Sequence, residues 1–156
     1  MRNDHLGDLI LTFPLLQTAT SWLGSSNVKA LINSDLATLF TNVFPDVEPL
    51  KDSGGNFLSL ARVIKESDCD TLISATSKTR NAWAAQWSGT PQRLGFGYKL
   101  NAIFYTQPLF VHRKNPPVHE SEFCLKYLDK FNDEIKRIPG LPDWSPPEQA
   151  MNEARS

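Results

Sequence analysis

Short apolar runs alternate along this chain with longer stretches in which apolar residues recur every three or four positions. The runs have the length of strands, and near-continuous apolar character is typical of parallel strands buried on both faces. Strands are predicted over three such runs and two weaker ones, namely Asn27–Asn33, Asp70–Ala75 and Arg93–Tyr98, then Val47–Lys51 and Phe104–His112. Strands that alternate with helices indicate an α/β fold with a mostly parallel sheet and helices on both faces.

The stretches between the runs have helical spacing. Helices are predicted over Ser34–Val43, Gly55–Ser67, Ser77–Trp87 and Glu120–Phe131, with Ser34 as the N-cap of the first. In the third helix Trp83 and Trp87 stand four positions apart, which predicts an aromatic pair facing the core. In the last helix Phe123, Tyr127 and Phe131 form one apolar stripe.

The stretch Gly7–Trp22 is ambiguous because it contains a proline. Pro14 would kink a helix that begins at Asp8, or it would lie in the first turn of a helix capped by Thr12. We favour helix across most of the stretch.

The chain changes character at Ile138. Four of its eleven prolines fall within the last 19 residues, which is typical of a linker. Within that segment Ser145–Glu148 has the spacing of a capping box with proline at the first helical position, so a short helix is predicted over Pro146–Ala154. We therefore expect one domain over residues 1–137, then a linker and the start of a further helix over residues 138–156.

Composition narrows the class of protein. The 156 residues include 16 Lys and Arg against 17 Asp and Glu, and a net charge of −1 argues against general nucleic-acid binding, which needs a basic excess. No apolar run approaches the ~20 residues of a membrane span, and Asp4 and Asp8 stand where a signal peptide would be basic and then apolar. Two cysteines, Cys69 and Cys124, give no disulfide framework, so a reduced cytoplasmic chain is expected.

Residues that could take part in catalysis or binding cluster at the start of the chain. The polar segment Arg2–His5 is followed by Gly7, which allows a tight backbone turn, and by Asp8 at the start of an apolar helix. A carboxylate is favoured there by the helix dipole, so on physical grounds alone Asp8 is a helix cap. The three histidines have no metal-ligand spacing with one another or with either cysteine, so no zinc site is expected.

Four segments carry a family resemblance. Residues Arg2–Leu16 read Arg-Asn-Asp-His-Leu-Gly-Asp, then three apolar residues, then Thr-Phe-Pro-Leu-Leu. Three later segments follow in order, Thr79–Ala82 (Thr-Arg-Asn-Ala), Gly89–Phe96 (Gly-Thr-Pro-Gln-Arg-Leu-Gly-Phe) and His119–Glu122 (His-Glu-Ser-Glu). Over about residues 1–135 these segments resemble glycosyltransferase family 9, the lipopolysaccharide heptosyltransferases.

The resemblance implies a GT-B fold, in which two Rossmann-like domains face each other across a cleft, and this chain resembles the N-terminal, acceptor-binding one. It implies inverting transfer of heptose, or a related sugar, from a nucleotide-sugar to lipid A/core oligosaccharide, without metal or other cofactor, in the cytoplasm and in peripheral contact with the membrane. Asp8 matches the aspartate proposed as general base. Arg80, Arg93, Lys78 and Gly7 are the further substrate-binding candidates, because guanidinium groups suit the phosphates and acidic sugars of such acceptors.

Two departures from the family pattern bear on these expectations. The family begins with an apolar strand ahead of the arginine, and this chain has none before Arg2, so a gap beside the Val28–Ile32 strand or a rearranged pairing is expected. The donor-binding domain is also absent, so the chain is expected to be an acceptor-domain fragment that is inactive alone. Two other interpretations stay open, a binding module for anionic glycans and a generic Rossmann-like domain. Arg93 is explained equally well as a solvated surface residue.

Overall fold

The computed structural model describes residues 1–111, 119–132 and 134–142, and five strands lie in this part of the chain. They are β1 (Lys29–Asn33), β2 (Glu48–Asp52), β3 (Thr71–Ile73), β4 (Gln92–Phe96) and β5 (Gln107–Leu109). Each overlaps one predicted strand, so the five predictions are confirmed. β5 is shorter than expected because residues before it form the 3₁₀ helix η3 (Leu100–Phe104), while His112 lies outside the described residues.

The strands form two parallel sheets. β1 pairs with β2, from Lys29 opposite Glu48 to Asn33 opposite Asp52. β3, β4 and β5 form the second sheet in that order, again with parallel pairing. The strand order therefore runs outward in both directions from the space between β1 and β3, which is the arrangement of a doubly wound α/β fold.

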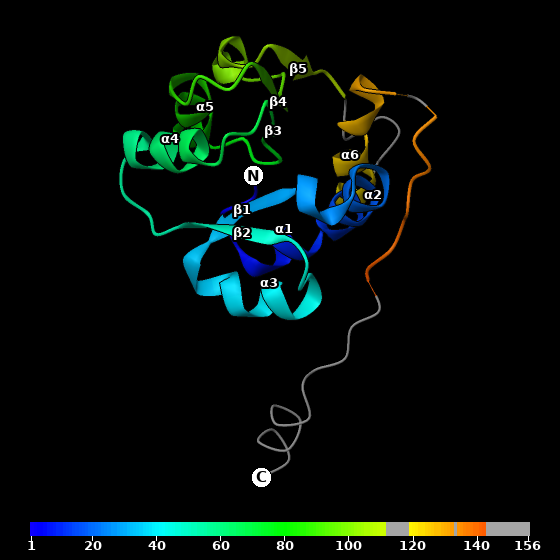
Figure 1. Ribbon diagram of the computed structural model, residues 1–156. Helices are drawn as coiled ribbons and strands as arrows, with labels where there is room; N and C mark the ends of the chain where they lie inside the picture. Colours follow the sequence, from blue (N-terminus) through cyan, green and yellow to red (C-terminus); the bar gives the residue numbers. More distant parts are fainter. Residues whose placement is uncertain (112–118, 133, 143–156) are drawn as a thin grey trace.

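The start of the chain lies in this space and connects the two sheets. The Arg2 N–H donates to the Leu31 carbonyl of β1 (2.9 Å), and the Ala75 N–H, just beyond β3, donates to the Met1 carbonyl (3.0 Å). The Met1 ammonium donates to the Ile73 carbonyl of β3. Figure 1 shows the N-terminus between the β1–β2 sheet and the β3–β5 sheet. The gap that the sequence predicted beside β1 is therefore present.

Helices cover both faces of the sheets, as predicted. They are α1 (Leu6–Ile10), α2 (Phe13–Leu23), α3 (Ala37–Val43), α4 (Phe57–Glu66), α5 (Thr79–Trp87) and α6 (Glu120–Leu125), with the 3₁₀ helices η1 (Ser25–Asn27), η2 (Ser34–Leu36) and η4 (Leu128–Lys130). Ala30 and Ile32 of β1 pack with α1, α2 and α3, whereas Leu31 packs with α4 and α5, because successive strand residues point to opposite faces. Among the described residues no helix is both long and apolar enough to span a bilayer.

The ambiguous stretch Gly7–Trp22 contains two helices. α1 ends at Ile10 and α2 begins at Phe13, so Pro14 lies in the first turn of α2, which confirms the second of the two alternatives. Thr12 occupies the N-cap position of α2, but its Oγ1 donates to the Leu9 carbonyl (2.6 Å) and does not cap the helix.

Three helix predictions need correction. Asn33, and not Ser34, caps the turn before α3, since its side-chain oxygen accepts from the Asp35 N–H at 3.0 Å. The predicted helix Glu120–Phe131 ends at Leu125 and continues as η4, although its stripe holds, with Phe123 and Tyr127 buried. The predicted helix Pro146–Ala154 and most of the linker lie outside the described residues.

The prediction for the tryptophan pair was wrong. Trp83 and Trp87 are 38% and 60% exposed. The small residues Ala82, Ala84 and Ala85 occupy the core side of α5 and are fully buried, so the two indole rings lie on the outer side, where they contact Phe57 of α4.

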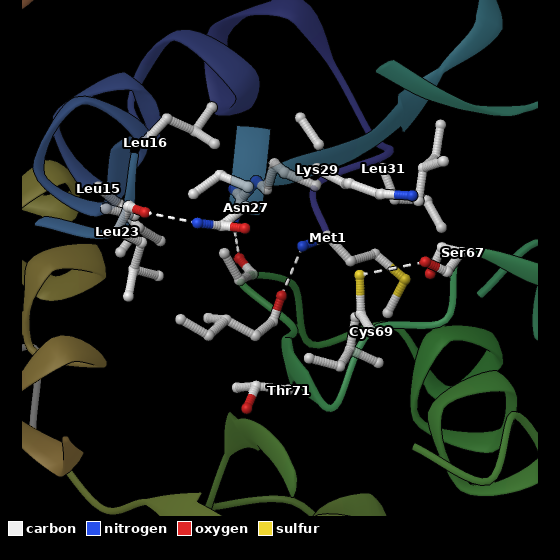
Figure 2. A pocket seen from close by; sticks show the side chains of 18 of the residues that line it. Met1, Leu15, Leu16, Leu23, Asn27, Lys29, Leu31, Ser67, Cys69 and Thr71 are labelled. Atoms are coloured by element: carbon white, nitrogen blue, oxygen red, sulfur yellow. Dashed lines mark hydrogen bonds between the residues drawn. The ribbon is translucent and has the colours of Figure 1, made fainter. Parts of the chain in front are cut away.

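An open groove of about 860 Å³ lies between β1 and β3, where the sheets separate. Its walls come mainly from apolar side chains of these strands and of α2. Figure 2 shows Met1 in the middle of the groove, with its ammonium directed toward the β3 backbone. Asp8 and Arg80 do not line this groove, but Arg2 does, so the groove adjoins the predicted polar site through that one side chain.

Candidate active site

Two of the predicted site residues, Asp8 and Arg80, lie near the carboxyl ends of the strands, together with Asp52, which the sequence analysis did not single out. Asp52 is the last residue of β2, Arg80 is in the first turn of α5, which follows β3, and Asp8 is in the first turn of α1. In open α/β sheets ligands bind at this edge, next to the point where the strand order reverses. The position of the site is therefore the one that the fold class favours.

Arg2 is the centre of the first group of polar residues, which we call the Asp8 cluster (Arg2, Asp4, Asp8 and Glu120). Its Nη2 is 2.7 Å from Asp8 Oδ1, its Nε is 3.1 Å from Asp4 Oδ1 and its Nη1 is 3.8 Å from Glu120 Oε1. Nη1 also donates to the Ala75 carbonyl. Three carboxylates and a backbone carbonyl thus hold one guanidinium, whose planar fork suits several acceptors at once.

Burial distinguishes the members of the Asp8 cluster. The Arg2 side chain is 9% exposed and the Asp4 side chain 10%, whereas the Asp8 side chain is 37% exposed. The acid on α1 is therefore fixed at one oxygen by a buried cation and is open to solvent elsewhere. Such an acid can accept a proton from a hydroxyl group that approaches from outside.

The second group, the Asp52 cluster, consists of Asn3, Asp52, Arg80 and Asn81. Arg80 binds Asp52 with both arms of its guanidinium, Nη1 to Oδ2 at 2.7 Å and Nη2 to Oδ1 at 2.9 Å. Asn3 donates to Asp52 Oδ2, and its amide oxygen accepts from Asn81 Nδ2 at 2.6 Å. The Gly54 N–H donates to Asp52 Oδ1 at 3.1 Å. This cluster therefore links β2 to α5 across the space between the sheets.

The hydrogen bonds of this cluster decide the protonation of Asp52. Burial alone would raise the pKa of its carboxyl group, but the hydrogen bonds from Arg80, Asn3 and the Gly54 amide outweigh burial and lower that pKa below its ordinary value. The hydrogen bond to Asp52 likewise raises the pKa of Arg80, against the opposing effect of its burial. The pair is therefore ionised over the whole physiological range.

The two clusters are neighbours, because Arg2, Asn3 and Asp4 are consecutive. One short backbone segment thus supplies the cation that holds Asp8 and the amide that holds Asp52. Arg80 was expected to meet anionic substrate groups directly, yet both arms of its guanidinium already bind Asp52. Its geometry in this structure is that of a residue that positions an acid.

The other predicted residues are placed as follows. Lys78 is exposed at the N-cap position of α5, next to Arg80. Gly7 lies inside α1 and not in a tight turn, and a Cβ there would meet no atom within 4 Å, so the space above it is open. Arg93 is not brought to the site: it lies near the amino end of β4, where its guanidinium donates to the Thr90 and Phe104 carbonyls and to Gln86. Its contact with substrate stays a prediction without geometric support.

Several members of the two clusters were missed by sequence reasoning. Arg2, Asn3 and Asp4 belong to the N-terminal motif, but the sequence predicted no role for them in the site. Asp52 carried a usable signal, because it is a lone acid at the end of an apolar strand, where α/β folds place ligands. Within the described residues no group of three or more His, Cys, Asp and Glu is arranged to hold a metal ion.

Comparison with known proteins places this geometry in context. No family model matches the chain. A protein of Haemophilus influenzae named "Putative glycosyltransferase" is 30% identical over an alignment of 145 positions, and the match covers 85% of this chain and 40% of that protein. The crystal structure of the glycosyl transferase family 9 protein from Veillonella parvula superposes with a TM-score of 0.70 at 22% identity, covering 98% of this chain and 45% of that one.

The chain thus spans less than half the length of the two proteins that it matches. The α/β fold expected from the sequence is confirmed, because nearly the whole chain superposes on a family 9 structure. The curated relative is independently named as a glycosyltransferase. Motifs, fold and sequence similarity therefore agree, and the resemblance of this chain to glycosyltransferase family 9 is confirmed.

Proposed function

We propose that this chain forms the acceptor-binding part of an inverting, metal-independent glycosyltransferase and that Asp8 is its general base. The observation that carries the proposal is the position of Asp8, held by the buried Arg2 at the carboxyl edge of the sheets and still 37% exposed. The similarity to glycosyltransferases over most of the chain supports the reaction class. The proposed substrates are a nucleotide-activated heptose, or a related sugar, and an anionic lipid A/core oligosaccharide.

In the proposed reaction the Asp8 carboxylate takes the proton of an acceptor hydroxyl group while the hydroxyl oxygen attacks the anomeric carbon. The new bond forms on the face opposite the leaving nucleoside diphosphate, whose bond to the sugar breaks, so the configuration at that carbon inverts. Arg2 fixes the direction of the carboxylate, and the Asp52 cluster fixes the start of α5. Lys78, exposed beside that cluster, is the proposed contact for acidic groups of the acceptor.

Asp8→Asn tests the proposed base. The variant is introduced into residues 1–142 grafted in place of the matching segment of the Haemophilus influenzae protein, and sugar transfer is followed by product formation. Because asparagine keeps the shape of the side chain but cannot accept the proton, we expect the turnover rate to fall by about 10²- to 10⁴-fold. The ungrafted chain, which matches 40% of that relative, is expected to give no product.

The matched control is Asp46→Asn, which removes the same charge from an exposed turn before the amino end of β2, at the opposite edge of the sheet from both clusters. It is expected to leave the rate unchanged. A grafted protein that turns over equally fast with asparagine at position 8 would refute the role of Asp8 and would favour a module that only binds glycans.

A further inference from the structure

The inner edges of β1 and β3 face each other across the groove of about 860 Å³. Each strand is paired on its outer side only, β1 with β2 and β3 with β4. Among the described residues, the backbone hydrogen bonds on the two inner edges are those of Met1 and Arg2. Strand edges with free backbone groups are ready templates for a further strand.

Met1 and Arg2 already behave as the end of such a strand. The Met1 amino group donates to the Ile73 carbonyl, and the Ala75 N–H donates to the Met1 carbonyl at 3.0 Å. This is the pattern of a parallel pair with Met1 opposite Ser74. Arg2 turns to the other side and donates to the Leu31 carbonyl of β1 at 2.9 Å. The groove therefore continues the path of a parallel strand on the amino side of Met1.

Further backbone groups of both strands are directed into the groove. The N–H and C=O of one strand residue point to the same side, and the side alternates along the strand. Because the Leu31 carbonyl points to Arg2, the Leu31 N–H and the Lys29 carbonyl also face the groove. Because the Ile73 carbonyl points to Met1, the Ile73 N–H and the Thr71 carbonyl face it from β3. In the described structure β2 and β4 lie on the outer sides, so none of these four groups has a strand partner.

The walls of the groove are apolar above and below the line of the strand. Met1 packs with the cluster that includes Ile64 of α4. A residue directly ahead of it would point to the opposite face, where Leu15 and Leu16 of α2 line the groove. Figure 2 shows these two leucines on one side of Met1 and Leu31 on the other. A strand in this position must therefore be apolar on both faces, as buried parallel strands are.

We propose that the groove binds the carboxyl-terminal end of an extended apolar peptide as a parallel strand between β1 and β3. The last residue of the peptide accepts from the Leu31 N–H and donates to the Lys29 carbonyl. The residue before it makes the same two bonds to β3, with the Ile73 N–H and the Thr71 carbonyl. The peptide ends there because Met1 occupies the next position, so its carboxyl group meets the Met1 amino group. Main-chain bonds supply affinity in this mode of recognition, and the apolar walls select the side chains.

An acyl chain is the other ligand that an apolar groove could take. It would suit the walls, but it would cover the backbone groups of β1 and β3 without offering them hydrogen bonds. Burying polar groups in that way is costly, whereas a peptide satisfies each of them. The exposed backbone therefore favours the peptide.

A bound peptide would join the two sheets into one parallel sheet. The added strand would run up to Met1 and so support Arg2, whose Nη2 is 2.7 Å from Asp8 Oδ1. The inference itself rests on the backbone geometry and the apolar walls of the groove. It does not depend on the proposed function.

A labelled peptide tests the inference. The probe is acetyl-Lys-Lys-Gly-Val-Ile-Val-Ile with a free carboxyl group and a fluorophore on its first lysine, and its binding to the intact chain is followed by fluorescence anisotropy. We expect saturable binding of one peptide per chain. Proline in place of the last valine removes the N–H that donates to the Thr71 carbonyl and should weaken binding by about tenfold.

Hydrogen exchange locates the bound peptide. The amides of Leu31 and Ile73 face the groove, and their exchange should slow by about tenfold or more when the peptide is saturating. The amides of Ile32 and Leu72 face β2 and β4 and should exchange at the same rate with and without peptide.

Ala19→Glu places a charge in the apolar wall that α2 contributes, and it should weaken binding by about tenfold or more. The matched control is Ala102→Glu, at another half-buried alanine that lies in η3 and not in the groove, and it should bind like the wild type. The inference is overturned if the peptide does not bind, if the proline peptide binds equally well, or if exchange at Leu31 and Ile73 is unchanged. Binding of a long-chain fatty acid in place of the peptide would also overturn it. Should Ala19→Glu fail to fold, the proline peptide and hydrogen exchange decide.

Discussion

At the scale of single residues, the polar site depends on two buried arginine contacts of different kinds. Arg2 gathers three carboxylates and leaves one of them exposed, whereas Arg80 forms a closed two-armed pair with a single buried acid. The first arrangement presents an acid to a ligand. The second is a fixed support, since Asp52 is 7% exposed and its oxygens are occupied by Arg80, Asn3 and Gly54.

Arg80→Gln should therefore destabilise the fold. The change leaves the buried Asp52 without its cation, and we expect a loss of about 1–3 kcal/mol in the free energy of unfolding, measured by urea denaturation at pH 7. The pKa of Asp52 is lowered in the folded state, so its stabilisation is present above the ordinary carboxyl pKa and is lost as the pH falls through the lowered value. The difference between wild type and variant should accordingly shrink below about pH 4.

Lys29→Gln provides the comparison for this prediction. It removes a cation from the exposed pair with Glu48, whose N–O distance is 3.0 Å, and should leave the free energy of unfolding nearly unchanged, because water screens such a pair. Equal effects of the two substitutions at pH 7 would contradict a supporting role for Arg80.

At the scale of elements, the packing of β4 depends on the missing side chain of Gly95. A Cβ added to Gly95 would lie 2.2 to 2.4 Å from ring atoms of Tyr105, so the tyrosine ring fills the space where a side chain would be. Tyr105 is buried, and burial raises the pKa of its hydroxyl group. The glycine therefore makes room for the ring of Tyr105, which connects η3 to β5.

We predict that Gly95→Ala lowers the free energy of unfolding by about 1–3 kcal/mol, because the tyrosine ring must move from a packed position. Gly7→Ala is the control: a Cβ there meets nothing within 4 Å, and alanine favours the helix that Gly7 occupies. Urea denaturation should show loss for the first and no loss for the second. A stable Gly95→Ala variant would show that the ring yields easily.

The strands and most helices could be predicted because apolar spacing reports burial directly. The outward direction of Trp83 and Trp87 could not be predicted. The alanines of α5 are also apolar, and their small side chains allow a closer contact with the sheet, so they take the buried side of the helix. The role of Asp8 stays a prediction from a motif. Its contact with Arg2 required coordinates, because no regular spacing fixes the path of the chain between the two residues, and the contact of Arg2 with Glu120 joins segments that are distant in sequence. The paired amides of Asn3 and Asn81 lay beyond sequence reasoning for the same reason.

At the scale of the whole molecule, the two sheets meet at the chain's first residue. Helices of both faces contribute to the walls around the junction, but the backbone hydrogen bonds across it come from Met1 and Arg2. Burial and the nearby Arg2 lower the pKa of the Met1 amino group from 8.0 to about 5. The folded state therefore favours the neutral form of this amino group over the charged form.

This shift predicts a pH dependence of stability. Between about pH 5 and pH 8 the unfolded chain binds a proton that the folded chain does not, so stability should rise with pH across that interval and level off above it. N-terminal acetylation removes the titrating group and should remove this part of the rise. Thermal unfolding of both forms from pH 5 to pH 8 provides the measurement, and identical profiles would exclude the amine as the source.

The groove between β1 and β3 also restricts how the protein can be handled. Anything joined ahead of Met1 begins inside this mostly apolar groove, beside the backbone of β3. Affinity tags, fluorophores or fusion partners at that end would disturb the hydrogen bonds by which Met1 and Arg2 connect the two sheets. Attachment there would therefore change the stability of the protein. Reporters are better introduced at exposed helical positions such as Glu66.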